Sequence, residues 1–396
     1  MMNLRNLFST LLLTSAMLLM GQQTYYGTTA SGGSFDLGTI YSIDDNGNHV
    51  VGHEMVRLEG SLPKSDLEQA PNGKFYGVTQ FGGEFGQGVL FEYDPVTDTY
   101  TVRYSFNGAS DGGQPVRGVT RARNGRLYGL CSTGGANNAG TLFEFIIGTG
   151  AYSVRVDFGG NGPGTIGGRP IAKLEPNSTA SILYGTTQFG GANGRGTVFS
   201  YGTIPTSGPG PTVSGHTVMH DFVGPGATST GINPVTGVTR SGGTLYGVTP
   251  SGGPNGSGAF YSVSTSSPFT QTVIRSFTST DADGRTPQGE PVVAGGVIYG
   301  TTSVGGTTGG GKIFSYDPNT TTFTAVHGFS NPDGVQSLSG MRTGADGKLY
   351  GACRSGGTTN GGTLFRFDPV GAVFEKLADM AGSGLSAPEA RLTESP

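Results

Sequence analysis

The stretch LYGTTQFGGANGRGTVFSY, residues 183–201, holds five glycines, yet aromatic and β-branched residues stand at both of its ends. Glycine adopts positive φ without steric cost, so it collects where a chain turns sharply. Aromatic and β-branched residues favour strands. The stretch therefore predicts two short strands joined by a glycine loop.

The same pattern recurs along the whole chain. Each copy opens with a Tyr-Gly pair, and the seven tyrosines are Tyr26, Tyr76, Tyr128, Tyr184, Tyr246, Tyr299 and Tyr350. A Gly-Gly pair begins six residues after each Tyr, another Gly follows at twelve, and a Phe or Tyr at fifteen. Repeats of roughly 20–50 residues are typical of solenoids and propellers.

The unit from Pro115 to Phe158 shows how one copy folds. The runs VRGVTRA and LYGLC flank Asn124-Gly125, and Asn-Gly between such runs is the strongest short signal for a β-hairpin. The strand-like runs TLFEFI and YSVRVDF follow the glycine loop. Four short antiparallel strands form one propeller blade, which cannot bury both of its faces alone. We therefore predict an all-β fold over residues 24–396, a seven-bladed β-propeller with four antiparallel strands per blade.

The two ends of the chain predict how this ring closes. The first copy starts at its second strand, TYYGTT, whereas PEARLTESP at residues 388–396 is similar to the first-strand segment PVRGVTRAR. We expect the C-terminal segment to supply the inner strand of blade 1, so that no sheet edge stays open. The glycine after each Tyr lies inside a strand, and there we expect a neighbouring blade to pack closely.

The N-terminal segment and the charge limit location and partners. An apolar run from Leu7 to Met20 follows Arg5, which predicts a secretory signal peptide over residues 1–23. This run is shorter than the ~20 residues that span a bilayer. We expect a protein that is secreted or at the cell surface, with the periplasm as an alternative, and no membrane span after cleavage. A net charge of −4 without a basic block gives no reason to expect nucleic-acid binding.

On these repeat residues, the chain resembles the GloVer (Gloeo_Verruco) tandem repeat of secreted bacterial proteins. That repeat reads much like residues 183–201 and carries an F…DG…P segment, seen here as FNGASDGGQP and FTSTDADGRTP. The resemblance implies a secreted, often surface-attached propeller. A weaker similarity is to kelch blades, in which Trp usually stands where this chain has Tyr100.

Residues with catalytic chemistry stand mostly at repeat positions. His220 and His327 occupy equivalent places near the ends of outer strands, and no HxH or HExxH spacing predicts zinc. We predict no catalytic residue, no metal ligand and no cofactor. In the turn STDADG, Asp281 and Asp283 leave Ca²⁺ as an alternative to a plain turn.

The two cysteines are expected to be free. Cys131 and Cys353 stand at the same place in blades 3 and 7, nearly opposite each other in a seven-bladed ring. This separation is far beyond the ~7 Å between Cα atoms that a disulfide allows.

For ligand binding we predict the end of the propeller that collects the glycine loops and the connectors between blades. Its acidic residues Asp111, Asp281, Asp283 and Asp333 are the candidate ligand-binding residues, because loops on a rigid frame commonly carry function. We expect a monomeric, non-enzymatic module that binds protein or polysaccharide, or has a structural role, in the cell envelope or outside the cell. The alternative is a secreted glycan-active hydrolase or lyase, which a pair of carboxylates in the central channel would favour.

Overall fold

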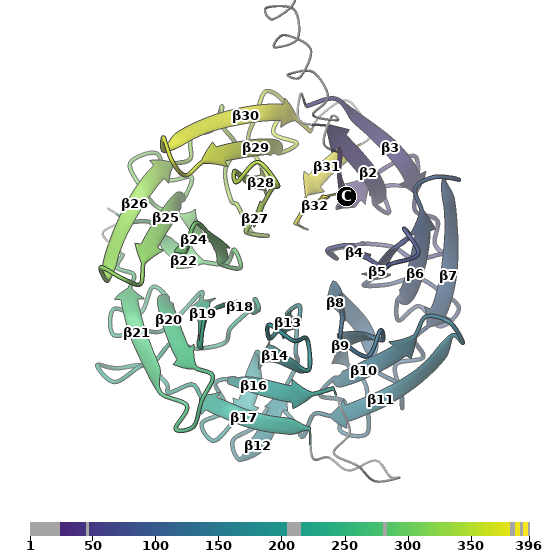
Figure 1. Cartoon of the computed structure of the whole chain (residues 1–396), viewed down its shortest axis with the longest axis horizontal. Helices are drawn as coiled ribbons and strands as arrows, with labels where there is room; N and C mark the ends of the chain where they lie inside the picture. Colours follow the sequence, from purple (N-terminus) through teal and green to yellow (C-terminus); the bar gives the residue numbers. More distant parts are fainter. Residues whose placement is uncertain are drawn as a thin grey trace, which may run out of the picture.

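The computed structural model describes residues 24–44, 47–203, 215–279, 283–380, 385–388 and 391–394. Within these residues the regular structure is β-strand, in seven sheets of four or five strands around a central axis (Figure 1) and one two-stranded sheet. The fold is the predicted seven-bladed β-propeller. Residues 1–23, for which we predict a signal peptide, lie outside the described residues, and no helix that could cross a membrane occurs among those described.

Each blade runs from an inner strand near the axis to an outer strand at the rim. Blade 1 contains β31 (Leu385–Pro388), β32 (Thr393–Glu394), β1 (Thr24–Gly32), β2 (Thr39–Asp44) and β3 (His49–Glu54). Blade 2 contains β4 (Glu68–Gln69), β5 (Phe75–Thr79), β6 (Val89–Asp94) and β7 (Thr99–Ser105). Blade 3 contains β8 (Gly113–Arg121), β9 (Leu127–Thr133), β10 (Thr141–Ile146) and β11 (Ala151–Asp157).

The other four blades follow the same order. Blade 4 contains β13 (Glu175–Pro176), β14 (Ile182–Thr187), β16 (Thr197–Gly202) and β17 (His216–Asp221). Blade 5 contains β18 (Val238–Ser241), β19 (Thr244–Thr249), β20 (Ala259–Ser264) and β21 (Gln271–Ser276). Blade 6 contains β22 (Arg285–Pro287), β23 (Val292–Ala294), β24 (Val297–Val304), β25 (Lys312–Asp317) and β26 (Thr322–Gly328). Blade 7 contains β27 (Met341–Thr343), β28 (Leu349–Cys353), β29 (Thr363–Asp368) and β30 (Val373–Asp379).

The glycine after each Tyr makes room for an aromatic ring of its own blade. A Cβ added to Gly77 would lie 2.4 Å from Cζ of Phe91, and one added to Gly129 would lie 2.4 Å from Cζ of Phe143. These rings belong to the residues paired with the two glycines on the next strand. The expectation that a neighbouring blade packs there is therefore wrong, because the aromatic residue of the same repeat fills that space.

The C-terminal segment closes the ring as predicted. In β32 Thr393 pairs with Tyr26 of β1, and in β31 Pro388 pairs with Thr29. Leu392 is buried among residues of blades 1 and 7. The first and last parts of the chain therefore share one sheet, which leaves blade 1 with an inner strand like the others.

The hydrophobic core is divided among the interfaces between blades. Seven clusters of buried residues occur in the described part of the chain, and each joins two successive blades. Between blades 2 and 3, for example, Tyr76 and Phe106 share a cluster with Phe143. Because no blade buries its faces without its neighbours, the ring is the smallest unit that completes the core.

Ring stacking joins the outer strands of successive blades at the rim. The ring of His53 in blade 1 stacks on Tyr100 in blade 2 with centroids 4.3 Å apart, and His327 stacks on Phe374 between blades 6 and 7 at 4.0 Å. Arg275 lies over Phe323 at the corresponding place between blades 5 and 6. His53 and His327 therefore pack between blades.

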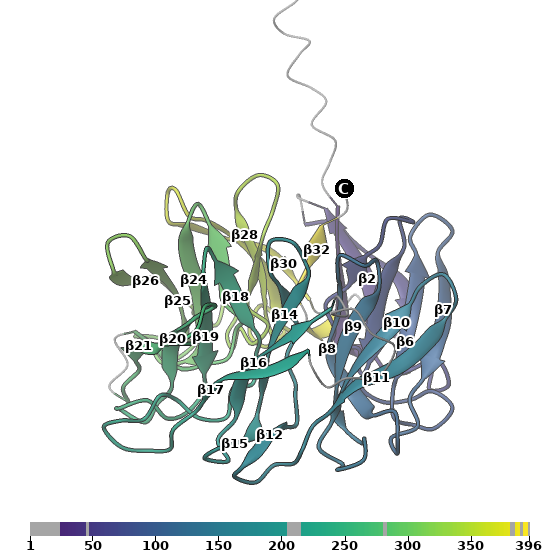
Figure 2. The same ribbon diagram turned by 60° about the horizontal axis from the view of Figure 1, so that its bottom comes forward.

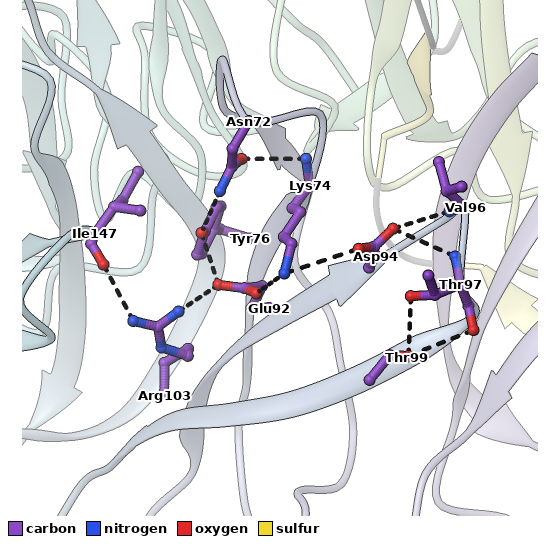
Figure 3. Close-up of polar contacts among 10 residues, drawn as sticks. All are labelled: Asn72, Lys74, Tyr76, Glu92, Asp94, Val96, Thr97, Thr99, Arg103 and Ile147. Carbon is purple, nitrogen blue, oxygen red and sulfur yellow. Dashed lines mark hydrogen bonds and ion pairs between the residues drawn. The ribbon is translucent and has the colours of Figure 1, made fainter.

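Blades 2 and 3 each carry a buried glutamate, Glu92 and Glu144, where blades 1, 4, 5 and 6 have serine. Figure 3 shows the contacts of Glu92. In blade 2, Lys74 Nζ lies 2.6 Å from Glu92 Oε1, the Tyr76 hydroxyl donates to Oε2 at 2.7 Å, and Arg103 pairs with the same carboxylate. Burial would raise the pKa of Glu92, but hydrogen bonds from Lys74 and Tyr76 and the charges of both cations hold it below its usual value. Arg103 also donates to the carbonyl oxygen of Ile147, so this network ties blade 2 to blade 3.

The glycine loops and the connectors between blades lie at one end of the ring, which we call the loop face. Strand β12 (Thr165–Gly168) of a connector pairs with β15 (Phe189–Gly191) of the following glycine loop, at the lower end in Figure 2. The Gly83 N–H likewise donates to the carbonyl oxygen of Arg57 (3.1 Å), and the Gly134 loop contacts Gly108. Loop and connector therefore form one continuous surface, as the strand order predicts.

Candidate functional site

Asp111 is part of the scaffold of the connector between blades 2 and 3. Its side chain is buried, accepts a hydrogen bond from the Tyr104 hydroxyl at 2.6 Å, and accepts another from the Asn107 N–H at 3.1 Å. Its carbonyl oxygen accepts a hydrogen bond from the Tyr152 hydroxyl. This geometry shapes the connector and leaves little of the carboxylate for a ligand.

The other predicted acidic residues lie on two further connectors. Asp283 pairs with Arg275 at the start of the connector between blades 5 and 6, and Asp281 lies outside the described residues. Asp333 accepts a hydrogen bond from Ser330 Oγ at 2.6 Å between blades 6 and 7. The structure therefore does not gather the predicted set into one cluster, and among the described residues no three His, Cys, Asp or Glu side chains could hold one metal ion.

Both cysteines are free and buried, as expected. Burial raises the pKa of the Cys131 and Cys353 thiols well above its usual value, so neither is an activated nucleophile. Burial also lowers the pKa of His216 and His220 to about 4. These histidines are neutral packing residues near pH 7.

The central channel contains a set of charges that our sequence analysis missed. Four charged residues occupy the same position in the inner segments of four blades. In each blade this position lies two residues before the inner-strand residue that pairs with the repeat Tyr. Three glycines occupy that register in the alternate blades. In the order of blades 1 to 7 they are Arg391, Asp66, Gly118, Lys173, Gly237, Glu290 and Gly340.

These channel charges alternate in sign around the axis and pair across blades. Arg391 Nε lies 2.8 Å from Asp66 Oδ2, and one terminal nitrogen of Arg391 lies 2.8 Å from Glu290 Oε1. Lys173 Nζ of blade 4 lies 3.4 Å from Glu68 Oε2 of blade 2. Blade 3, which lies between them, has Gly118 at this position. The last segment of the chain therefore links blade 1 to blades 2 and 6 through one guanidinium.

Two glutamates of the channel have raised pKa values. The Arg240 N–H donates to Glu175 Oε1 at 3.1 Å, between blades 4 and 5. Burial raises the pKa of Glu175 to about 7, and the negative charge of Glu290 adds to that rise. Burial also raises the pKa of Glu290. Gly237 makes room for this arrangement, because a Cβ added there would lie 2.8 Å from Glu290 Oε2.

On the loop face, the glycine loops of blades 1 and 2 lack a polar residue that the other five blades have at the same position. Nine residues after the repeat Tyr, blades 3, 4 and 5 have Asn, and blades 6 and 7 have Thr. Asn137 and Asn193 each donate a hydrogen bond at 3.1 Å to the carbonyl oxygen of the Phe that ends the outer strand. Blades 1 and 2 have Phe35 and Phe85 instead, which cannot make this bond and are 63% and 53% exposed.

Leu58, which is 79% exposed, lies on the connector between these two glycine loops. The Leu62 N–H of the same connector donates to the carbonyl oxygen of Leu37 in the blade 1 loop at 2.8 Å. On its other side the connector accepts the hydrogen bond from Gly83 in the blade 2 loop. We call Phe35, Leu58 and Phe85 the blade 1–2 patch; they lie on three adjoining segments of one face.

The patch could have been found from the sequence. Phe35 and Phe85 are visible as exceptions at a register where the other blades have Asn or Thr. Large exposed apolar residues that gather on one face mark interaction sites more often than isolated ones do. Our predicted acidic residues share the loop face with this patch but lie on other connectors.

Several solved structures have a similar fold. A putative 6-phosphogluconolactonase from Bacteroides uniformis is similar with a TM-score of 0.61 and 15% identity, over 94% of this chain and 99% of that one. An oligogalacturonate lyase from Vibrio parahaemolyticus is similar with a TM-score of 0.50 and 10% identity, over 91% and 87% of the two chains. At such identities the likeness concerns the fold alone. No curated protein matches the chain.

The repeat itself has a family. The model of the Gloeobacter/Verrucomicrobia repeat matches residues 14–229 and again residues 211–396, and the two matches together cover the seven glycine-rich copies. The chain therefore belongs to the Gloeobacter/Verrucomicrobia repeat family.

Proposed function

We propose that this chain is a secreted, non-enzymatic binding module of the cell envelope or exterior, monomeric, that takes a protein or glycan on the loop face over blades 1 and 2. The observation that carries the proposal is the replacement of the scaffold Asn or Thr by exposed Phe35 and Phe85 in two adjacent blades. These blades give up a hydrogen bond that orders the loop in other blades, and they present aromatic surface to solvent. Such an exchange lowers the stability of the free chain, and residues that break a local rule in this way are expected at functional sites.

The state of the other reactive groups supports a binding role. Asp111 and Asp333 accept hydrogen bonds within their connectors, and Asp283 is paired with Arg275. The histidines of the outer strands pack against rings of the same or the next blade. These groups hold the scaffold, so the loop face is a rigid frame for recognition.

The test compares the wild-type chain with the variant F35N/F85N, which introduces the residue used by blades 3 to 5. Both proteins are incubated with envelope material and with a panel of polysaccharides, and retained protein and released sugar are measured. We expect the wild type to be retained without sugar release and the variant to lose retention. Equal retention of both proteins would rule out the blade 1–2 site, and sugar release would rule out the non-enzymatic role.

A second candidate is a glycan-active enzyme with its site in the channel. Glu175 and Glu290 favour it, because glycoside cleavage uses two carboxyl groups, one kept protonated by a raised pKa and the other ionised, and burial raises the pKa of Glu175 to about 7. The pairing of Glu290 with Arg391 counts against it, since that contact occupies one of the carboxylate oxygens. Sugar release by the wild type that is lost in E175Q and retained in F35N/F85N would establish this candidate instead.

A further inference from the structure

We propose that the blade 1–2 patch docks a protein partner that presents apolar side chains beside Lys or Arg. This inference rests on the proposed binding function and names the class of ligand. Three features of the patch lead to it: its chemistry, its rigidity and the sign of the charge around it.

The patch offers the surface that protein side chains fill. Phe35 and Phe85 project from neighbouring glycine loops, and the aliphatic Leu58 stands on the connector between them. An exposed leucine adds apolar area but no hydrogen bond, which suits the methyl and methylene groups of a protein segment better than the hydroxyl-rich edge of a sugar. Buried aromatic anchors supply most of the binding free energy in protein interfaces.

The segments that carry the patch are held before any partner arrives. In the connector, the Glu59 N–H donates to the carbonyl oxygen of Val56 (2.9 Å), and the Tyr100 hydroxyl donates to the carbonyl oxygen of Glu59 (2.7 Å). Ser61 and Phe81 form a β-bridge between the connector and the blade 2 loop. A surface ordered in advance loses less conformational entropy on binding.

The negative charge around the patch favours a partner that carries positive charge. The two glycine loops, the connector and the adjoining end of β3 carry four carboxylates and two cations, apart from Asp66, which pairs with Arg391 in the channel. The carboxylates are Asp36, Glu54, Glu59 and Glu84, and the cations are Arg57 and Lys64. The surplus is negative, so it attracts a basic partner and repels an acidic glycan. It also disfavours a second copy of this chain, because a symmetric contact would bring the same carboxylates together.

The test is selection from a phage-displayed library of random peptides on the full chain, with F35N/L58S/F85N for counter-selection. We expect enriched peptides that combine apolar residues with a net positive charge, bind F35N/F85N at least about tenfold more weakly, and weaken as salt is raised. Thermal unfolding shows whether F35N/F85N folds, and we expect it to be at least as stable as the wild type, because Asn can make the hydrogen bond that orders this loop in blades 3 and 4. The matched control V223N removes an exposed apolar residue from another connector of the same face and should leave binding unchanged.

Several outcomes would overturn the proposal. Enriched peptides that are acidic, or that bind F35N/F85N as tightly as the wild type, would do so. Retention of a polysaccharide that depends on Phe35 and Phe85, without peptide enrichment, would exclude a protein partner and leave the proposed binding function intact. Association of the wild type with itself through the patch, measured by sedimentation, would assign the surface to a second copy. Unchanged retention of envelope material by F35N/F85N would instead defeat the proposed site itself.

Discussion

At the scale of single residues, the position after each repeat Tyr requires glycine because an aromatic side chain lies against it, and not because the chain turns there. Replacing Gly77 with Ala would place a methyl group 2.4 Å from Cζ of Phe91, whose ring has no free space in the buried blade. We expect G77A to lower the free energy of unfolding by about 1–3 kcal/mol or more, the usual cost of overpacking a core. Chemical denaturation of the purified chain measures this change.

The control for this prediction is G148A. Gly148 lies in an exposed turn without positive φ, and no atom lies within 4 Å of the position its Cβ would take. We expect a change within roughly 0.5 kcal/mol, as for most surface substitutions. Equal stability of G77A and G148A would show that the ring of Phe91 does not occupy this position.

The buried histidines predict how stability depends on pH. His216 and His220 have a pKa of about 4 in the folded chain, against 6.5 for an unperturbed His. The unfolded chain therefore takes up more protons below pH 6.5, so this contribution to stability is present above 6.5 and is lost as pH falls toward 4. Glu175, whose pKa is raised to about 7, acts in the opposite direction between pH 4.5 and 7.

We expect H216F, which keeps a ring at the interface, to lose less stability than the wild type between pH 7 and pH 5. The difference should be roughly 1–2 kcal/mol, because one pKa unit corresponds to about 1.4 kcal/mol. Urea unfolding at the two pH values measures it. An identical loss in both proteins would mean that His216 is not held neutral by burial.

At the scale of elements, the sequence predicts the strands and loops well because their registers are set by glycine and aromatic residues that recur at fixed spacing. It does not predict the channel charges, because the distance from the inner segment to the repeat Tyr varies. Glu290 lies nine residues before Tyr299, whereas Lys173 lies eleven before Tyr184. When the copies are aligned on the Tyr, the channel charges therefore fall at different positions, although the structure places them at the same register of the inner segments.

The candidate site shows a related difficulty. Asp-Gly pairs in the connectors attract attention as ligand groups, but Asp111 turns inward to Tyr104, which no local pattern reveals. Phe35 and Phe85 stand at a fixed register, and they are found only when exceptions to the repeat are examined. Residues that repeat build the blades, and a residue that departs from the repeat needs another reason to be there.

The final segment of the chain carries a prediction of its own. Replacing Arg391 with Ala would leave Asp66 and Glu290 buried without their shared cation. We expect R391A to lose about 3–5 kcal/mol, the usual cost of breaking a buried ion pair. Thermal and chemical unfolding measure the loss.

The variant D66N/E290Q/R391M tests the cause of that loss. It removes the charges together, so we expect it to be clearly more stable than R391A, since buried carboxylates are no longer left unpaired. If the triple variant is as unstable as R391A, buried carboxylates left without a cation are not the cause of the loss.

At the scale of the whole molecule, stability and recognition depend on one closed ring. Each hydrophobic cluster joins two successive blades, and between blades 7 and 1 the returning C-terminal segment adds Leu392 to the cluster and pairs with β1. The blade 1–2 patch lies on the loops of that first blade and of its neighbour. Closure of the ring therefore fixes the frame on which the proposed docking surface stands.

Closure is tested most directly by a crosslink between the two ends of the chain. Ser31 of β1 pairs with Ser386 of β31 in antiparallel register, and such partners have Cα atoms within disulfide reach. We predict that S31C/S386C forms an intramolecular disulfide on oxidation and unfolds at a higher temperature than its reduced form. The control S31C/A387C, shifted by one residue to the opposite side of the strand, should not form it readily. A disulfide in the control but not in S31C/S386C, or in neither variant, would contradict a ring closed in this register.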